Sequence, residues 1–194
     1  MLNNLSKYEI ILGSNSPRRK ELLAGLDIDF EVKTMPDTDE SYPPSMNPEE
    51  VPLYIAEKKA AAFLDTLKKD ELLITADTVV VLKSGEILGK PQNREDATRM
   101  LTLLSEEEHK VITGVCIVTK EKAARFSVSS SVKFSQLPPE DIAYYLEKYS
   151  PYDKAGSYGI QEWIGYVGVE SIEGSFYNVM GLPVQRLYQE LKKF

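Results

Sequence analysis

Two consecutive arginines lie where an apolar run turns into a predicted helix. Arg18 and Arg19 follow Ser14-Asn15-Ser16-Pro17, and the apolar run occupies residues 9–12. A helix N-terminus carries about half a positive charge, so anions are favoured there and cations are not. Two arginines at that end make electrostatic sense if a phosphate binds the same turn. The alternative is that both side chains are solvated or pair with nearby acids, and the spacing alone leaves the two readings open.

Asp77 is the second unusual residue, because it separates the apolar residues 72–75 from the apolar residues 79–82. An ionised carboxylate between two buried strands is costly without a partner. Lys90, across a predicted hairpin, is the partner that we expect. Asp77 is then either a structural ion-pair member or a carboxylate that activates water or holds a divalent cation.

Asp39 and Glu40 are further possible oxygen ligands, although acidic loops are more often simply solvated. Carboxylates together with arginines and lysines around a Ser/Gly turn are typical of magnesium-assisted chemistry on a polyphosphate. His109 is the single histidine, which disfavours a zinc centre. Cys116, the single cysteine, lies in an apolar run and is predicted to be a small buried hydrophobe.

A third segment, residues 153–181, is rich in closely spaced glycines and tyrosines. Glycine lets the backbone approach a ligand, and the amide of Gln161 could read the donor and acceptor edge of a base. Taken alone, such a segment is more often structural. Trp163 and the tyrosines could stack on a base, but packing in the core or on the surface is the more common role of such residues.

These residues must be positioned by alternating strands and helices. The predicted helices begin at Pro17, at Asn47 or Val51 (running to about residue 67), after Asn93, near Pro139 and at Pro183. The predicted strands are residues 9–12, 30–33, 72–75, 79–82, 86–88, 111–119 and 126–134. A hairpin loop at residues 83–85 favours a mixed sheet. The pattern, without repeat or linker, predicts one α/β domain over residues 1–194.

The composition excludes several classes of protein. The 194 residues are 42% hydrophobic and 27% charged, which is ordinary for a globular protein and unlike a disordered one. The net charge of −7 disfavours binding to nucleic acid or to an anionic membrane. No apolar stretch approaches the length that spans a bilayer, and residues 1–7 lack the apolar core of a signal peptide. We therefore expect a cytoplasmic protein without membrane or nucleic-acid partners, and leave a homodimer open.

Six motifs together resemble the Maf family of nucleoside triphosphate pyrophosphatases. They are SNSPRRKELL (14–23), ADTVV (76–80), LGKP (88–91), HKVITGV (109–115), DKAGSYGIQ (153–161) and GSFYNVMGLP (174–183). They occur in the familiar order and cover nearly the whole chain.

The resemblance implies an α/β fold with an elongated mixed sheet, similar to the inosine triphosphate pyrophosphatase fold. It also implies hydrolysis of a nucleoside triphosphate to the monophosphate and pyrophosphate, dependent on Mg²⁺ or Mn²⁺. By position, Asp77 resembles the proton acceptor of the family, with Glu40 beside it as a metal ligand. The residues that resemble those around the triphosphate and metal are Ser14, Arg18, Glu40, Lys59 and Lys90, and those that resemble the determinants of substrate choice are Arg18, Thr78 and Gln161. The last two motifs are similar to the branch that acts on dTTP and UTP, with modified pyrimidine nucleotides as an extension.

Two alternatives stay open at this point. One is the same reaction on a methylated guanine nucleotide. The other is a nucleotide-binding regulator of septum formation, for which hydrolysis would be incidental.

Overall fold

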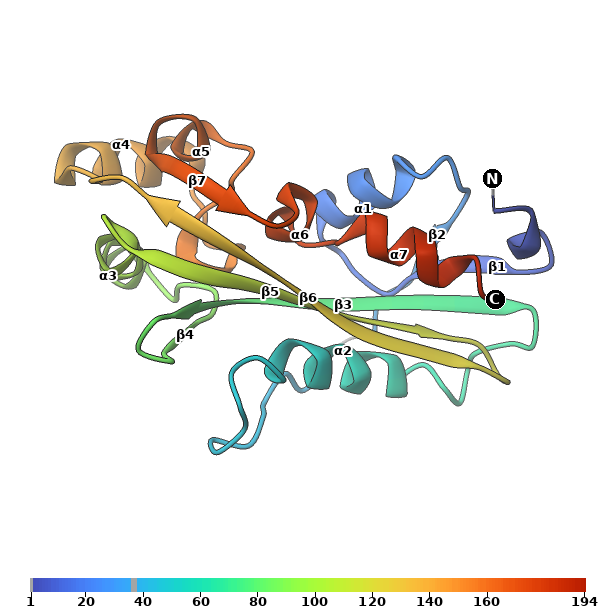
Figure 1. Cartoon of the computed structure of the whole chain (residues 1–194). Coiled ribbons are helices and arrows are strands. Elements are labelled where there is room, and N and C mark those ends of the chain that lie inside the picture. Colours follow the sequence, from blue (N-terminus) through green and yellow to red (C-terminus); the bar gives the residue numbers. More distant parts are fainter. Residues whose placement is uncertain (1, 36–37) are drawn as a thin grey trace. The chain divides into compact units, whose positions relative to one another are not determined.

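The computed structural model describes residues 2–35 and 38–194 (Figure 1). The strands are β1 (Glu9–Leu12), β2 (Glu31–Val32), β3 (Glu71–Leu82), β4 (Ile87–Leu88), β5 (Glu108–Val118), β6 (Ala123–Phe134) and β7 (Val169–Glu173). The α-helices are α1 (Pro17–Ala24), α2 (Val51–Ala61), α3 (Arg94–Leu104), α4 (Pro139–Tyr149), α5 (Trp163–Gly168), α6 (Phe176–Met180) and α7 (Val184–Leu191). Two short 3-10 helices are η1 (Asn3–Leu5) and η2 (Ala155–Ser157).

The strands form one mixed sheet in the order β2-β1-β3-β5-β6-β7, with β4 paired to β3 outside this path. β1 is parallel to both β2 and β3, whereas β4 and β7 are antiparallel to their neighbours. The hairpin between β3 and β4 closes as predicted, because Gly85 adopts a φ of 88° and its N–H donates to the carbonyl of Leu82. The prediction of an α/β fold with a mixed sheet flanked by helices is confirmed.

The chain divides into two compact units, and each of the long strands β3, β5 and β6 has residues in both units. Unit 1 comprises Met1–Asp77, Thr113–Val128 and Gly181–Phe194, and unit 2 comprises Thr78–Ile112 and Ser129–Met180. The two units are described separately below.

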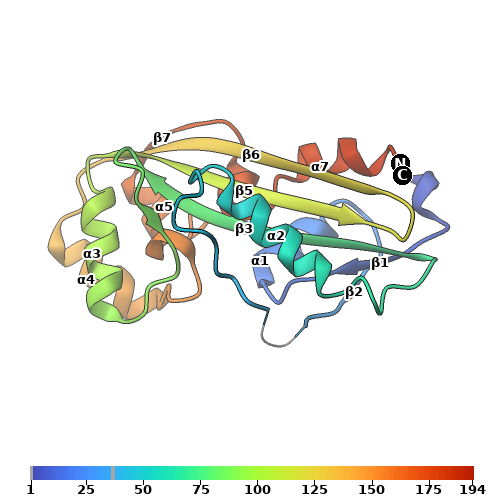
Figure 2. The same ribbon diagram turned by 90° about the horizontal axis from the view of Figure 1, so that it is seen from below.

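In unit 1, α1 and α7 lie on one face of the strands and α2 lies on the other (Figures 1 and 2). Beneath α2, a core of buried apolar side chains includes Ile11, Phe63 and Cys116. Burial raises the pKa of the Cys116 thiol to about 11. Cys116 is therefore a packed, protonated side chain, which confirms the prediction of a small buried hydrophobe.

In unit 2, α3 and α4 pack against each other. The side chain of Asn93 caps α3 by accepting a 2.8 Å hydrogen bond from the N–H of Asp96, as the sequence predicts. His109 lies in an aromatic cluster with Phe134 and Tyr158, and its Nε2 is 2.7 Å from the Tyr158 hydroxyl oxygen. Its placement makes the single histidine a core residue.

Three predicted element boundaries were wrong. The two runs around Asp77 form one continuous strand, β3, because backbone pairing tolerates a polar side chain that has its own partner. α2 ends at Ala61 rather than near residue 67, and turns carry Phe63 and Leu67 into the core. The glycine-rich segment contains α5, β7 and α6, which its many glycines concealed. Along residues 2–35 and 38–194, no helix combines the length and the apolarity needed to cross a membrane.

Candidate active site

The centre of the site in unit 1 is an ammonium group held between two carboxylates. Lys59 Nζ lies 2.8 Å from Asp77 Oδ1 and 2.8 Å from Glu40 Oε1. The side chains of Lys59 and Asp77 are 15% and 14% exposed, while Glu40 is half exposed. Glu40 and Asp77 thus place two carboxylates around one ammonium group.

The partner of Asp77 corrects one expectation from the sequence. The ammonium group paired with this carboxylate belongs to Lys59 on α2, whereas the hairpin had suggested Lys90. Lys59 is 18 residues from Asp77 in sequence and lies outside the hairpin. Lys59 becomes its neighbour through the packing of α2 on the sheet, which spacing along the chain does not reveal.

A buried hydrogen bond fixes α2 over β3 at this place. Thr75, fully buried and two residues before Asp77, donates from Oγ1 to the carbonyl of Ala56 at 2.7 Å. Ala56 precedes Lys59 by three residues, close to one helical turn. Gly114 of β5 allows the start of α2 to approach, because a Cβ at that position would lie 2.2 Å from the backbone nitrogen of Leu53. The register between Lys59 and Asp77 thus follows from backbone contacts on both sides.

The turn between β1 and α1 brings Ser14 and Arg19 together. Ser14 Oγ accepts from the N–H of Ser16 at 3.3 Å and from Nη1 of Arg19 at 3.4 Å. Nε of Arg19 donates to the carbonyl of Gly181 at 2.9 Å, which fixes the guanidinium from a second side. Ser16 caps α1 as predicted, and its first turn contains no acidic residue.

Arg19 is electrostatically coupled to the carboxylates of the site. Burial lowers its pKa from the ordinary arginine value, and the neighbouring Arg18 lowers it further, while Asp77 and Glu40 act in the opposite direction. Burying an arginine beside another arginine is costly, and a bound anion offsets this cost. The sequence analysis noted both arginines, but the resemblance assigned a role to Arg18 alone. In the sequence, Arg19 is marked only by its place as the third residue of α1, in the turn that Ser16 caps.

The acidic loop that carries Glu40 is held to α2 by Lys58, the residue before Lys59. Lys58 Nζ lies 2.7 Å from Asp39 Oδ2 and donates to the carbonyl of Ser41 at 2.9 Å. The hydrogen bond from Lys58, together with those from Ser41, lowers the pKa of Asp39 well below its usual range. Lys58 therefore holds Asp39 and Ser41, and the adjacent Lys59 holds Glu40 between them.

The remaining predicted site residues, Thr78, Lys90 and Gln161, lie in unit 2. Thr78 follows Asp77 on β3 and is half buried, whereas Lys90 is exposed after β4. The segments that carry Lys90 and Gln161 are joined, because the N–H of Gly156 donates to the carbonyl of Gly89 at 3.0 Å. Gln161 Oε1 is buried without a hydrogen-bond partner, which is unusual for an amide oxygen in a folded protein.

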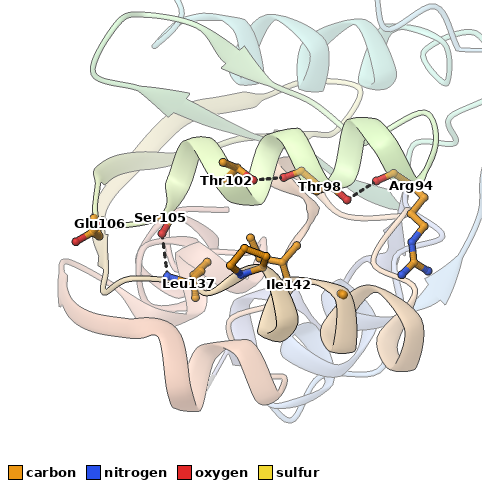
Figure 3. Close-up of a pocket in the computed structure, with 9 residues that line it drawn as sticks. Arg94, Thr98, Thr102, Ser105, Glu106, Leu137 and Ile142 are labelled. Atoms are coloured by element: carbon orange, nitrogen blue, oxygen red, sulfur yellow. Dashed lines mark hydrogen bonds between the residues drawn. The ribbon is translucent and has the colours of Figure 1, made fainter.

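A groove of about 360 Å³ between α3 and α4 in unit 2 is separate from these residues (Figure 3). Its hydroxyl groups already serve the local fold. Thr98 and Thr102 donate to carbonyls one turn earlier in α3, and Ser105 Oγ accepts from the N–H of Leu137 (Figure 3). The groove contains none of the predicted site residues.

The sequence that forms this site is similar to a known protein family. The sequence model of the family described as "Maf-like protein" matches residues 9–194. The chain belongs to the Maf family. The resemblance inferred from the six motifs is therefore confirmed.

Curated relatives of the family are similar along their full length. A Parabacteroides distasonis protein named dTTP/UTP pyrophosphatase is 65% identical over 194 residues, with 100% of both chains covered. A protein of the same name from Porphyromonas gingivalis is 61% identical, covering 100% of this chain and 98% of the relative. A Flavobacterium johnsoniae relative, also of that name, is 46% identical over 96% of this chain and 95% of its own.

Among solved structures, a HAM1 protein from Coxiella burnetii is similar at 14% identity and a TM-score of 0.47, covering 96% of this chain and 100% of that one. A dITP/XTP pyrophosphatase from Mycobacterium abscessus gives 13% identity and a TM-score of 0.43, with 95% of each chain covered. Likeness at this level adds nothing to the family assignment.

Proposed function

We propose that this protein hydrolyses dTTP and UTP, and by extension modified pyrimidine nucleotides, to the monophosphate and pyrophosphate. The substrate class is supported by the relatives named dTTP/UTP pyrophosphatase, which share up to 65% of their residues with this chain over its full length. The chemistry is supported by one observation above all: the largely buried Asp77 is paired with Lys59 in a group that also contains Glu40.

Asp77 is the proton acceptor in this proposal. Its carboxylate takes a proton from the water molecule that attacks a phosphate, and the bond between the α- and β-phosphates breaks as pyrophosphate separates from the nucleoside monophosphate. The neighbouring Lys59 ammonium orients the Asp77 carboxylate through the 2.8 Å contact.

Lys59, Arg19 and Arg18 bind the triphosphate. Arg19 is oriented by Ser14 and by the carbonyl of Gly181, so its position is set before substrate arrives. Lysine and arginine are the usual partners of phosphate oxygens. Ser14 and Lys90 complete the polar groups that we assign to the phosphates.

The donor set of the site fits a divalent cation. Glu40 and Asp77 already share one cation, the Lys59 ammonium, and hard carboxylate oxygens are the ligands that Mg²⁺ and Mn²⁺ take. In the described part of the chain, no group of three or more His, Cys, Asp or Glu residues is placed to hold a metal. Two carboxylates suffice for Mg²⁺, because it completes its shell with water and substrate phosphates. Such an ion would neutralise charge on the phosphates and leaving group.

Gln161 selects the base, with Arg18 and Thr78 contributing to substrate choice. The unpaired Oε1 of Gln161 can accept the N3–H of uracil or thymine, and its amide NH₂ can donate to a ring carbonyl. Adenine has no ring N–H on this edge, whereas guanine has N1–H beside its O6, so guanine is discriminated by the larger size of the purine ring and not by this pair of hydrogen bonds.

The test is pyrophosphate release from a panel of UTP, dTTP, CTP, ATP, GTP and 7-methyl-GTP, each with Mg²⁺, Mn²⁺ or a chelator. We expect metal-dependent release from UTP and dTTP with the highest kcat/KM. Preference for 7-methyl-GTP would contradict the base assignment while preserving the reaction. Folded protein that releases pyrophosphate from no nucleotide would overturn the proposal and favour a nucleotide-binding regulator.

A further inference from the structure

The segment that carries Gln161 lacks the backbone hydrogen bonding of a regular element. It follows the short helix η2, in which Gly156 and Ser157 both adopt left-handed backbone angles, with φ of 67° and 62°. A chain in this conformation has no repeating hydrogen bonds to hold it. One backbone hydrogen bond, from the N–H of Glu162 to the carbonyl of Gly159 at 2.9 Å, closes a turn around Gln161, and the side chains that contact this turn set its place in the fold.

Those side chains form a compact polar cluster of Tyr145, Lys154 and Glu162. The Tyr145 hydroxyl donates to one carboxylate oxygen of Glu162 and accepts from the N–H of Gly159 at 3.0 Å. Lys154 Nζ lies 3.0 Å from the other oxygen of Glu162. Both carboxylate oxygens of Glu162 are thus engaged by different partners, one from α4 and one from the start of the segment.

The cluster is shielded from water and has little room to rearrange. Tyr145 is fully buried, and Lys154 is 7% exposed. At Gly159, an added Cβ would lie 2.9 Å from Cδ of Glu162 and 3.0 Å from Cε of Lys154, so this close approach requires glycine. A low-dielectric setting strengthens a fully paired polar network and penalises a broken one.

The cluster holds the chain on both sides of Gln161. Glu162 is its immediate neighbour, and Gly159 precedes it by two residues, so one hydroxyl group on α4 is bonded to both. Gln161 Oε1, between these anchors, is buried and unpaired. The fixed backbone and the unsatisfied amide oxygen are separate observations, and both are expected of a group held ready for a ligand.

We propose that Tyr145, Lys154 and Glu162 are positioning residues for base selection and act through Gln161. This inference rests on the proposed function, because it assigns to the cluster the discrimination of uracil and thymine from other bases. A glutamine on a mobile backbone would present its amide in several places and accept several bases. The cluster holds the backbone on both sides of Gln161 and in this way contributes to specificity without touching the substrate.

The test compares Tyr145→Phe with Tyr149→Phe as its matched control. Tyr149 lies one turn further along α4, and its ring stacks on that of Tyr145 at 5.2 Å between centroids. Each variant therefore loses one tyrosine hydroxyl group from the same helix. We expect Tyr145→Phe to raise KM for UTP and dTTP about tenfold with kcat nearly unchanged, and to change values for poorer nucleotides much less. The ratio of kcat/KM between UTP and GTP should fall accordingly, as the loss of one preorganising hydrogen bond predicts.

Two further comparisons separate positioning from general stability. Combining Tyr145→Phe with Gln161→Ala should lower the UTP preference no further than Gln161→Ala alone, because both act on one contact. Lys154→Arg should retain most of the preference that Lys154→Met loses. Equal losses for every nucleotide, or a lower Tm with unchanged base preference, would overturn the inference.

A binding measurement keeps this inference distinct from the reaction itself. Calorimetric titration with the α,β-imido analogues of UTP and GTP should show weaker UTP-analogue binding in Tyr145→Phe and unchanged GTP-analogue binding. If wild-type protein binds the UTP analogue selectively but hydrolyses nothing, the proposed reaction fails and the positioning role stands. Unchanged selectivity of the variant, in active protein, overturns the positioning role alone.

Discussion

At the scale of the residue, the proposed chemistry depends on the placement of one carboxylate. Asp77 interrupts an otherwise apolar strand, yet its cost of burial is offset by Lys59 at 2.8 Å. The same contact fixes the direction in which the carboxylate points. The residue that offsets the cost of burying Asp77 therefore also orients it for the proposed role as proton acceptor.

Asp77→Asn should lower kcat by about 10²-fold or more, because an amide accepts no proton and ligates a cation weakly. Nucleotide binding should persist, since Arg19 and Lys59 remain. The measurement is pyrophosphate release at saturating UTP, with circular dichroism to verify folding. Asp65→Asn, an exposed carboxyl in the turns after α2, is the control; kcat of Asp77→Asn within twofold of that control would contradict the assignment.

His109 makes stability depend on pH in mildly acidic solution. Burial lowers its pKa from 6.5 to about 4, so the unfolded chain binds a proton between these values and the folded chain does not. Stability from this residue is present above pH 6.5 and is lost as pH falls towards 4, by about 3 kcal/mol in total. Denaturant unfolding at pH 7 and pH 4 should show that loss in the wild type and much less in His109→Gln. Equal pH slopes for the two proteins would contradict it.

At the scale of the element, the reaction depends on how one helix lies on one strand. α2 brings Lys59, and through the loop before it Glu40, to the middle of β3. The hydrogen bond from Thr75 to Ala56 sets this register, and the methyl group of Thr75 also fills the space beside Gly13, where an added Cβ would lie 2.8 Å from it. One buried side chain therefore aligns α2, β3 and the turn that leads to Ser14.

Thr75→Val should destabilise the protein by about 1 kcal/mol, the usual net value of one buried hydrogen bond. It should also lower kcat by about tenfold, because small displacements of catalytic groups are costly. Thr75→Ser keeps the hydroxyl and should retain most of the activity. Urea unfolding and pyrophosphate release provide the two measurements, and equal kcat values for the two variants would count against the alignment role.

At the scale of the whole molecule, net charge limits the range of partners. An excess of seven negative charges opposes approach to a polyanion. A metal–nucleotide complex is less anionic than the free nucleotide, and a local cluster of Arg18, Arg19 and Lys59 offers it positive charge. Acidity of the surface and affinity for a triphosphate are therefore compatible.

From this charge, we expect no binding to a labelled single-stranded or duplex oligonucleotide, even at low salt where electrostatic attraction is strongest. Fluorescence anisotropy across a salt series is the measurement. An anisotropy increase that weakens with salt would show a basic surface that overrides the net charge, and would contradict this prediction.

Sequence patterns were sufficient for the local features of the fold. Ser16 and Asn93 cap their helices as predicted, because capping is set by a side chain and the next three residues. The alternation of apolar runs gave the α/β class and the mixed sheet. Within the glycine-rich segment, the same reasoning missed α5, β7 and α6, since glycine there serves close approach and conceals short elements. One domain over residues 1–194 stays a prediction.

The site itself was only partly predictable. The family resemblance singled out Asp77, Glu40 and Lys59, but the ion pairs of both carboxylates with Lys59 arise from the packing of α2 on β3, and no local spacing encodes that contact. Arg19 was visible in the sequence, yet its hydrogen bond to Gly181 joins residues 162 positions apart. Contacts within one turn, such as helix caps, can be inferred from the spacing of residues. Contacts between residues far apart in the sequence depend on how the elements pack, and spacing does not reveal them.

Asn4 and Lys7 lie beside the last residues of the chain in unit 1. The amide of Asn4 donates to the carbonyl of Leu191 at 2.8 Å, and Lys7 Nζ donates to the carbonyl of Phe194 at 3.2 Å. The order of the segments along the chain can therefore be changed with little effect on the native contacts. A circular permutant, with Phe194 joined to Leu2 by a short glycine-serine linker and the chain opened between Ser84 and Gly85 in the exposed hairpin, should fold and release pyrophosphate at near wild-type rates. Its new ends would provide a site for fusing a reporter domain away from the native termini.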